Sequence, residues 1–322
     1  MAINLLNLTP NKVSRDLSGY ITYIYGPGGA GKTTLGVSTP KPLLLAFEKG
    51  YNALPGVLAQ DITTWGQMKE VLRELKKPEV KEAFKTIVVD TVDIASVLCE
   101  KYVCNQLGIE NIGDGGWSTN GWAKVKREWE NTFRAITMEG YAVVFISHSK
   151  DKTFKPKNAP EYNQIVPSCS TAYNEIIKNM ADIMGYIDVD GNTRKLVLRS
   201  NDGSIDCKCR FKYITPVINF SYQSLVDALN EAIDKEATET GNKFITNERA
   251  RVTSTVEYDY DALMAEFSDL AGALMSKDQT KYGPKITQII DKLLGRGKKV
   301  SDTTPEQAEF IYLIIQEIKE LN

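Results

Sequence analysis

The residues best suited to chemistry form one glycine-rich run, Gly26-Pro27-Gly28-Gly29-Ala30-Gly31-Lys32-Thr33-Thr34. It matches G-x-x-x-x-G-K-[ST], the pattern of a phosphate-binding loop. The glycines let the backbone curl so that successive N–H groups point at phosphate oxygens, and the helix expected to follow adds its positive end. Lys32 would neutralise the β- and γ-phosphates, and the Thr33 hydroxyl would ligate Mg²⁺. The alternative is a glycine-rich turn without a ligand, but the apolar strand expected at residues 21–25 favours the phosphate loop.

Two carboxylates end other apolar runs. Asp90 closes residues 86–90, and we expect it to reach the metal through water. Many phosphate-loop enzymes carry a glutamate directly after this aspartate, but here the next residue is Thr91. We therefore expect Glu48, at the end of residues 43–47, to act as the base that activates water. Parallel strands present their carboxyl ends at one edge of a sheet, which would bring Glu48 to the phosphates. The alternative is a surface glutamate paired with Lys49.

His148 is the only histidine and follows the apolar run at residues 141–147. We expect it at the same edge of the sheet as Glu48 and Asp90, where a ring N–H could report the presence of the γ-phosphate to the segment that follows. The alternative is a histidine that is hydrogen-bonded near a strand end for structural reasons.

The elements that would position these residues alternate between strands and helices. Apolar runs at residues 20–25, 42–47, 86–90 and 141–147 predict strands buried on both faces of a parallel sheet. A stripe of Trp122, Val125, Trp129, Phe133 and Ile136 predicts an amphipathic helix. Residues 181–189, 193–200 and 204–213 read as antiparallel strands that extend the sheet. We therefore predict an α/β core over residues 1–233.

The rest of the chain predicts a smaller second part. Residues 234–256 are polar and aperiodic, which indicates a linker. Residues 257–322 contain three amphipathic patterns, the last of which starts at Thr304-Pro305-Glu306-Gln307, a capping-box sequence. We expect a three-helix module there.

Composition excludes several classes of protein. The 322 residues carry 39 Lys and Arg against 41 Asp and Glu, so the net charge of −2 does not indicate a polyanionic partner, although a local basic patch can hide in that average. No apolar run approaches the roughly 20 residues of a membrane span, and we expect no membrane association. One histidine excludes a zinc site with several histidine ligands, and five cysteines do not suggest a disulfide framework. We expect a cytoplasmic protein.

In their order along the chain, these segments resemble the RecA-like ATPases over residues 18–230. LLLAFEKG resembles the strand that ends in the catalytic glutamate, and TIVVDTVDIA resembles the Walker B strand. YAVVFISHSK resembles the strand ending in a polar γ-phosphate sensor, with His148 where glutamine is usual. CKCRF resembles the Lys-x-Arg-aromatic motif, which maps to Lys208 and Arg210. The sequence is most similar to the phage ATP-binding proteins of this family that are associated with single-strand annealing.

The resemblance implies a function in outline. It implies ATP and Mg²⁺ as cofactors, a RecA-like core, and assembly in which Lys208 and Arg210 reach the ATP of a neighbouring subunit. It also implies that two loops, residues 108–121 and 149–167, bind single-stranded DNA. Cations along the backbone and aromatic faces under the bases hold such strands, and the candidate DNA-binding residues are Trp117, Lys150, Lys152, Phe154, Lys155 and Lys157. Alternatively, both segments are ordinary mobile loops.

Three hypotheses follow. The first is a DNA-stimulated ATPase of phage recombination or replication, located in the host cytoplasm. The second is a small-molecule kinase, which is disfavoured because no arginine-rich lid segment follows the sheet. The third is a nucleotide-gated loader or scaffold, in which residues 257–322 dock a partner such as a helicase or an annealing protein.

Overall fold

The computed structural model describes residues 6, 8–114, 116, 120–155, 160–249 and 258–321. It divides the chain into two compact units, residues 1–254 and 255–322. None of the helices in the described ranges combines the length and apolar character needed to cross a membrane.

The first unit is built on a mainly parallel sheet of ten strands. Eight of them run in the order β11-β9-β8-β2-β6-β5-β3-β4, with β10 paired to β8 and β7 paired to β6. The strands are β2 (Ile21–Gly26), β3 (Pro42–Ala46), β4 (Ala59–Asp61), β5 (Thr86–Asp90), β6 (Ala142–Phe154), β7 (Tyr162–Pro167), β8 (Ile183–Asp190), β9 (Thr193–Val197), β10 (Lys208–Cys209) and β11 (Val217–Asn219). A separate parallel pair joins β1 (Val13–Ser14) to β12 (Ile245–Thr246). The predicted α/β fold class is confirmed.

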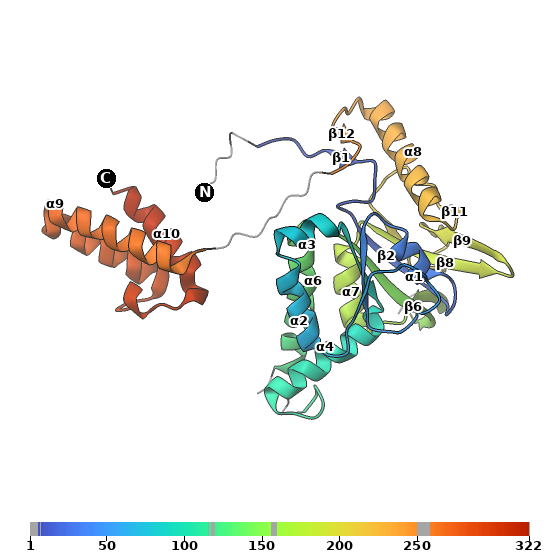
Figure 1. Cartoon of the computed structure of the whole chain (residues 1–322), viewed down its shortest axis with the longest axis horizontal. Helices are drawn as coiled ribbons and strands as arrows, with labels where there is room; N and C mark the ends of the chain where they lie inside the picture. Colours follow the sequence, from blue (N-terminus) through green and yellow to red (C-terminus); the bar gives the residue numbers. More distant parts are fainter. Residues whose placement is uncertain are drawn as a thin grey trace. The chain divides into compact units, whose positions relative to one another are not determined.

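Helices cover both faces of this sheet (Figure 1). They are α1 (Lys32–Val37), α2 (Trp65–Glu74), α3 (Pro78–Ala83), α4 (Val92–Leu107), α6 (Gly121–Met138), α7 (Thr171–Met180) and α8 (Tyr222–Thr240). In β6, Val143 and Phe145 join the apolar core that contains residues of α2, α4, α6 and α7. Val144 and Ile146 point to the opposite face, where they pack with Val37 of α1. This double burial is why the strands read as continuous apolar runs.

The predicted amphipathic helix forms as α6, and all but one of the apolar side chains in its stripe are buried. Val125, Trp129, Phe133 and Ile136 are fully buried, but Trp122 is 51% exposed. Trp122 lies in the first turn, two residues after the N-cap residue Asn120. The side chain at the first position of the stripe is therefore exposed at the start of the helix.

Two boundaries in the first unit differ from the prediction. Helix α8 continues to Thr240 and ends at Gly241, and residues 245–246 pair with β1, so residues 234–240 and 245–246 are not linker. Of the strand predicted over residues 204–213, Lys208–Cys209 pairs with β8, and Ile205 forms an isolated bridge with Ile165 of β7. The other residues of this segment are not in a strand, because its two short pairings go to different partners.

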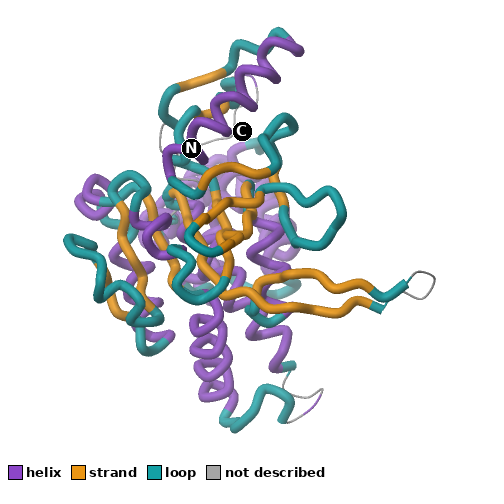
Figure 2. The backbone as a smooth tube through the Cα atoms, turned by 90° about the vertical axis from the view of Figure 1, so that its right-hand side faces the viewer, coloured by secondary structure: helices purple, strands orange, loops and turns teal. Residues whose placement is uncertain are grey.

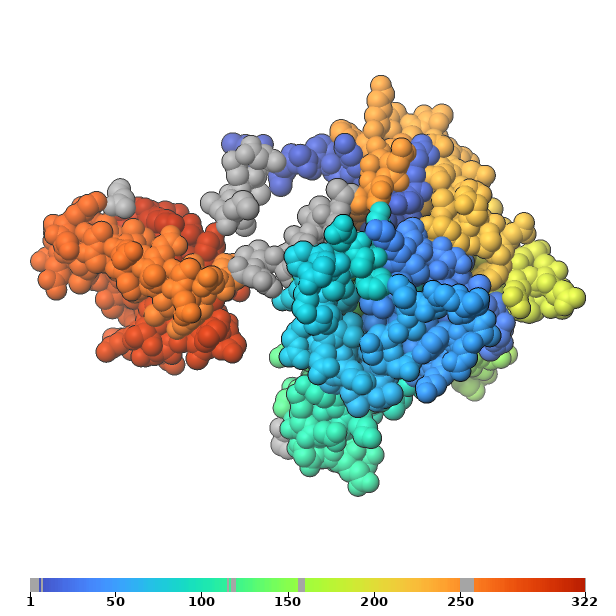
Figure 3. Space-filling view, in the orientation of Figure 1, coloured from blue at the N-terminus to red at the C-terminus, as the bar shows by residue number. Residues whose placement is uncertain are grey.

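The largest difference concerns the second predicted loop. Residues 149–154 continue β6 beyond the sheet and pair with β7 in antiparallel register, from Ser149↔Pro167 to Phe154↔Tyr162. The segment is therefore a β-hairpin that projects from the unit, as Figure 2 shows. A second hairpin, β8–β9, projects from another side of this unit (yellow in Figure 3).

The second unit consists of helices around its own apolar core. They are α9 (Tyr260–Leu294), the 3₁₀ turns η2 (Val300–Asp302) and η3 (Pro305–Gln307), and α10 (Ala308–Lys319). The backbone of Asp278 is not helical, so α9 is two helices joined at a kink, in keeping with the predicted pattern. The predicted capping box at Thr304 and Gln307 is present. Ile311, Ile314, Ile315 and Ile318 are all fully buried against α9.

Candidate functional site

The phosphate loop joins the end of β2 to the start of α1. Gly29 (φ 73°) and Gly31 (φ 97°) adopt left-handed backbone conformations, which residues with a Cβ rarely adopt. A Cβ on Gly31 would also lie 3.1 Å from the Phe220 ring. Gly28 has open space around it, Ala30 is buried, and Thr34 accepts a helical bond from Ser38. The structure thus gives residues 26–34 the strand–loop–helix form predicted from the sequence.

Lys32 is held inside this loop and is only 6% exposed. Its Nζ donates to the carbonyl oxygens of Gly26 (3.0 Å) and Pro27 (2.8 Å) and lies 3.4 Å from Nδ1 of His148. Burial lowers the pKa of Lys32, while the carboxylates of Asp90 and Glu48 oppose that shift. An ammonium group in such a place stays charged most readily when an anion approaches it.

Strand pairing explains why the predicted side chains converge. Gly26 is paired with His148 between β2 and β6, and Ala46 is paired with Asp90 between β3 and β5. The backbone N–H of Glu48 donates to the carbonyl oxygen of Asp90 at 3.2 Å. These residues end neighbouring parallel strands, so the site forms at the carboxyl edge of the sheet.

Asp90 lies against the phosphate loop. The Thr33 hydroxyl donates to Oδ2 of Asp90 at 2.5 Å, and Asp90 is 6% exposed. Burial raises the pKa of the Asp90 carboxyl, and the Thr33 hydrogen bond only partly offsets it. A hydroxyl and a buried carboxylate side by side are oxygen donors of the kind that Mg²⁺ binds, and a cation would compensate the buried charge.

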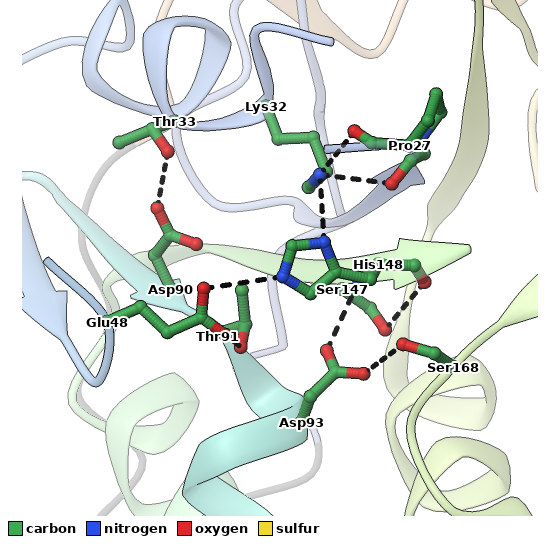
Figure 4. Close-up of polar contacts among 11 residues, drawn as sticks. Pro27, Lys32, Thr33, Glu48, Asp90, Thr91, Asp93, Ser147, His148 and Ser168 are labelled. Carbon is green, nitrogen blue, oxygen red and sulfur yellow. Dashed lines mark hydrogen bonds and ion pairs between the residues drawn. The ribbon is translucent and has the colours of Figure 1, made fainter. Parts of the chain in front are cut away.

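His148 connects the lysine to Glu48 (Figure 4). Its Nε2 lies 3.3 Å from Oε2 of Glu48, and its Nδ1 faces Nζ of Lys32. Lysine only donates hydrogen bonds and a carboxylate only accepts them, so the contacts assign a neutral ring with its proton on Nε2. Glu48 is fixed from its other side, because the Thr91 hydroxyl donates to Oε1 at 2.6 Å. The result is a continuous chain from Lys32 through His148 and Glu48 to Thr91.

Several residues of the site were not predicted from the sequence. Thr91 was noted only for not being glutamate, although its place beside Asp90 was a signal. Asp93 accepts hydrogen bonds from the backbone N–H of His148 and from the Ser168 hydroxyl. Arg194 of β9 donates from Nη2 to the carbonyl oxygen of Gly29 at 3.5 Å. No pattern in the sequence pointed to these last three residues.

Lys208 and Arg210 lie elsewhere in the first unit. Nζ of Lys208 donates to the carbonyl oxygens of Lys178 (2.6 Å) and Asn179 (3.1 Å), and Arg210 also donates to Asn179 (3.1 Å). Both side chains thus cap the carboxyl end of α7. Nε of Arg210 lies 3.4 Å from Asp182, just before β8 begins. Lys208 pairs with Met184, near the start of β8, whereas the phosphates would lie at the strand ends.

The candidate DNA-binding residues divide into two sets. Lys150, Lys152 and Phe154 belong to the β6–β7 hairpin, and Lys155 directly follows β6. Trp117 and Lys157 lie outside the described residues. The structure therefore brings three of the six predicted residues into one element, with a fourth next to it.

Comparisons with known proteins agree with this geometry. A model of the family described as an AAA domain, AAA_24, matches residues 18–230. The whole chain aligns with the SPbeta prophage-derived uncharacterized protein YorG of Bacillus subtilis (strain 168), at 29% identity over 333 residues and 99% of that protein.

Two solved structures are also similar. The RadB recombinase gives a TM-score of 0.38 at 15% identity, over 65% of this chain and 90% of that one. The KaiC-like protein PH0186 from Pyrococcus horikoshii OT3 gives 0.34 at 11% identity, over 57% and 79%. The family match covers the unit that carries the phosphate loop, Asp90, Glu48 and His148. This match spans more than half of the chain, so the chain belongs to the AAA_24 family of AAA domains.

Proposed function

We propose that the protein binds ATP with Mg²⁺ and hydrolyses it, with Glu48 as the base that activates water. The observation that carries this proposal is the chain of contacts that joins Lys32, the phosphate-binding lysine, to Glu48 through His148. Thr33 and Asp90 would hold Mg²⁺, which when bound neutralises charge on the β- and γ-phosphate oxygens.

The side chains suggest how ATP would rearrange the site. Among the described residues, the three polar contacts of Lys32 Nζ are with two carbonyl oxygens and the His148 ring. A charged phosphate oxygen is a stronger acceptor, so Lys32 would turn to the γ-phosphate and release Nδ1 of His148. Glu48 would then take a proton from water while the oxygen attacks the γ-phosphorus. The bond from that phosphorus to the bridging oxygen breaks, and ADP and phosphate leave.

The test is ATP turnover by Glu48→Gln. We expect the rate to fall about 10²- to 10⁴-fold, the usual contribution of a general base, while binding of a fluorescent ATP analogue stays unchanged. Glu70→Gln, an exposed position on α2, is the matched control and should turn over ATP as the wild type does. Unchanged turnover by Glu48→Gln would show that Glu48 is not the base.

We also propose that the β6–β7 hairpin binds single-stranded DNA. Because successive strand residues face opposite ways, Lys150, Lys152 and Phe154 share one face, and Asp151 lies on the other. Tyr162 pairs with Phe154, and their rings stack with centroids 5.3 Å apart at 12°. Nζ of Lys152 lies 4.8 Å from the centre of the Phe154 ring. Cations beside a flat aromatic surface suit a sugar–phosphate strand and its bases.

Fluorescence anisotropy with a labelled thymidine oligonucleotide tests this proposal. Stacking of one base contributes roughly 1–3 kcal/mol, so Phe154→Ala should weaken binding at low salt about tenfold. Thr153→Ala is the control, since it removes a side-chain bond to Asn163 (2.8 Å) on the opposite face and should bind normally. Equal affinities for all three proteins would contradict the assignment of this face.

We further propose that subunits assemble so that Lys208 and Arg210 complete the site of a neighbour. The support is their place, because they sit near the start of β8 and away from their own phosphate loop. A mixture tests the idea. Arg210→Ala and Lys32→Ala should each be inactive alone, while the mixture regains turnover because intact loops meet intact arginines. No recovery in mixtures that still assemble would contradict the shared site.

We place this activity in phage DNA recombination or replication, in the host cytoplasm. The support is full-length similarity to a prophage-derived protein.

The second unit has its own apolar core and would be the part that docks a replication or recombination partner. Deletion of residues 255–322 should then leave ATP turnover intact and abolish that docking.

A further inference from the structure

The carboxylate of Asp93 joins the part of β6 that carries His148 to the base of the β6–β7 hairpin. Asp93 lies in the first turn of α4, immediately after the phosphate site. Its Oδ2 accepts from the backbone N–H of His148 at 3.3 Å, and its Oδ1 accepts from the Ser168 hydroxyl (Figure 4). These partners are 55 and 75 residues away along the chain, so Asp93 joins three segments that are distant in sequence.

Ser168 closes the arrangement from the other side. Its backbone N–H donates to the carbonyl oxygen of His148 at 2.8 Å. Its own carbonyl oxygen accepts from Nζ of Lys150 at 2.9 Å. The first rung of the hairpin, Ser149↔Pro167, lies directly between these bonds. We call Asp93, Ser168 and the His148 backbone the Asp93 clamp.

The clamp is placed where the two proposed activities meet. The imidazole of His148 contacts Lys32 and Glu48, whereas its backbone N–H and carbonyl are held by Asp93 and Ser168. Near the clamp, Ile165 of β7 is also held, because its backbone bonds to Ser204 and Asp206. The far part of the hairpin is more exposed, with Tyr162 46% exposed. The orientation of the hairpin therefore depends on the clamp and on this second anchor near its base. Hydrogen bonds to a carboxylate are stronger than neutral ones and can transmit a shift of the His148 backbone without breaking.

Both oxygens of Asp93 are engaged by the protein itself, which separates its role from that of Asp90. Asp90 meets Thr33 of the phosphate loop, while among the described residues the Asp93 carboxylate accepts from the backbone of β6 and from the turn that follows β7. Asp93 thus acts through other residues.

We propose that Asp93 and Ser168 are positioning residues that couple the phosphate site to the β6–β7 hairpin. When the γ-phosphate draws Lys32 away from His148, the ring and its backbone shift, and the clamp carries that shift into the hairpin. This inference rests on the proposed function: its first test needs nucleotide bound at the phosphate loop, and its second test also needs DNA bound at the hairpin.

Hydrogen–deuterium exchange of the full chain tests the coupling without DNA. The proteins are wild type, Ser168→Ala, Ser168→Thr and Thr153→Ala, each with and without Mg²⁺ and a non-hydrolysable ATP analogue. In wild type, the analogue should change exchange in peptides covering residues 149–167. Ser168→Ala should lose that response, and Ser168→Thr should restore it because the hydroxyl returns. Thr153→Ala loses a side-chain bond of the same hairpin but keeps the clamp, and it should respond as wild type does.

Analogue affinity is measured on the same samples, which separates the two claims. If wild type does not bind the analogue, the proposed function itself fails. If wild type binds it without any change in the hairpin, or if Ser168→Ala binds it and responds as wild type does, the coupling is overturned and the ATPase proposal stands. A merely structural role for Ser168 would raise exchange in both states and leave the response to nucleotide in place.

The ring of His148 provides a second measurement, which tests the coupling in the opposite direction, from the hairpin to the phosphate site. Since His148 is the only histidine, its ring signals in an NMR spectrum are assigned at once. Coupling between two sites is reciprocal, so an oligonucleotide bound to the hairpin should shift these signals in wild type and not in Ser168→Ala. An equal shift in Ser168→Ala at equal DNA occupancy would overturn the coupling.

Discussion

Strand β6 contributes to two regions that hold their side chains in different ways. In the phosphate site Lys32 and Asp90 are each 6% exposed, and their polar atoms have partners within the protein. Along the hairpin Lys150 and Lys155 are exposed and Tyr162 is 46% exposed. Both regions are rich in charged side chains, but only the first buries them, which costs folding free energy.

The difference teaches what each region is prepared for. A site that stabilises charge during a reaction works best when its groups are fixed beforehand and water is excluded. A surface that binds a flexible polyanion needs cations that can adapt, and it gains affinity by releasing counterions. If this comparison is right, the two regions respond to mutation, salt and pH in different ways.

The largest effect should come from Lys32→Ala. Lys32 would make about two charge-assisted bonds to phosphate of roughly 1.5 kcal/mol each, so we expect ATP affinity to fall about 100-fold. DNA binding measured without nucleotide should persist, since the substitution removes no proposed DNA contact and reaches the hairpin only through His148 and the Asp93 clamp. Calorimetric titration with ATP and anisotropy with DNA check the two statements. Lys101→Ala, an exposed lysine of α4, serves as the control. A loss of DNA binding in Lys32→Ala would break the separation between the regions.

A smaller loss is expected from Thr91→Val. The substitution keeps the shape of the side chain but removes the hydroxyl that donates to Glu48. A hydrogen bond to a charged group contributes roughly 1.5–3 kcal/mol, so misorientation of Glu48 should lower kcat about tenfold. ATP affinity should stay within a factor of two because Thr91 makes no contact with the phosphate loop among the bonds described. If kcat is unchanged while Glu48→Gln is inactive, Glu48 does not need Thr91 to hold it.

The sequence made much of the phosphate site predictable. Lys32, Asp90, Glu48 and His148 each follow an apolar run, and parallel strands bring such positions to one edge. Their convergence needed only the strand assignments. The contacts of Asp93 needed the tertiary structure, because its partner Ser168 lies 75 residues away and no local pattern links them.

The hairpin shows a signal that was present and not used. Lys150, Lys152 and Phe154 alternate with Asp151 and Thr153, which is the period of a strand, although the resemblance to the RecA-like ATPases implied a loop here. The end of α8 was harder to predict from the sequence. Residues 234–240 carry no apolar stripe, and the helix there is held by local bonds such as that from the Thr238 hydroxyl to Asp234 (2.8 Å).

The salt dependence of DNA binding should show whether the lysines of the hairpin contact phosphates. Each phosphate contact to a single strand contributes about 0.7 to the slope of log affinity against log salt. Lys152→Gln should therefore lower the slope by about 0.7 and weaken binding about fivefold at 0.1 M salt. Lys101→Gln should leave both quantities unchanged. A lower affinity without a change in slope would mean that Lys152 acts through its contact with the Phe154 ring and does not meet a phosphate.

The smallest effect tests the cost of burying charge in the phosphate site. Burial raises the pKa of Asp90, so the native state holds this proton more tightly than the unfolded chain does. Stability from this group is therefore lost as the pH rises through the folded pKa, and above that pH the native protein carries a buried charge without full compensation.

Asp90→Asn keeps an oxygen that can accept from the Thr33 hydroxyl and removes that charge. Without Mg²⁺ and nucleotide at pH 7, we expect it to melt about 2–4 °C above wild type, as roughly 1 kcal/mol does in a domain of this size. The gap should shrink as the pH falls through the Asp90 pKa, where the wild-type carboxyl also becomes neutral. With Mg²⁺ and ATP the order should reverse, because only the wild type gains a cation beside its carboxylate and ligands stabilise the state that binds them. Scanning fluorimetry across pH, with and without Mg²⁺ and ATP, measures all three. A lower melting temperature for Asp90→Asn at pH 7 without ligand would mean that attraction to Lys32 outweighs the cost of burial, and the phosphate site would then be stabilised by the charges that we expect to strain it.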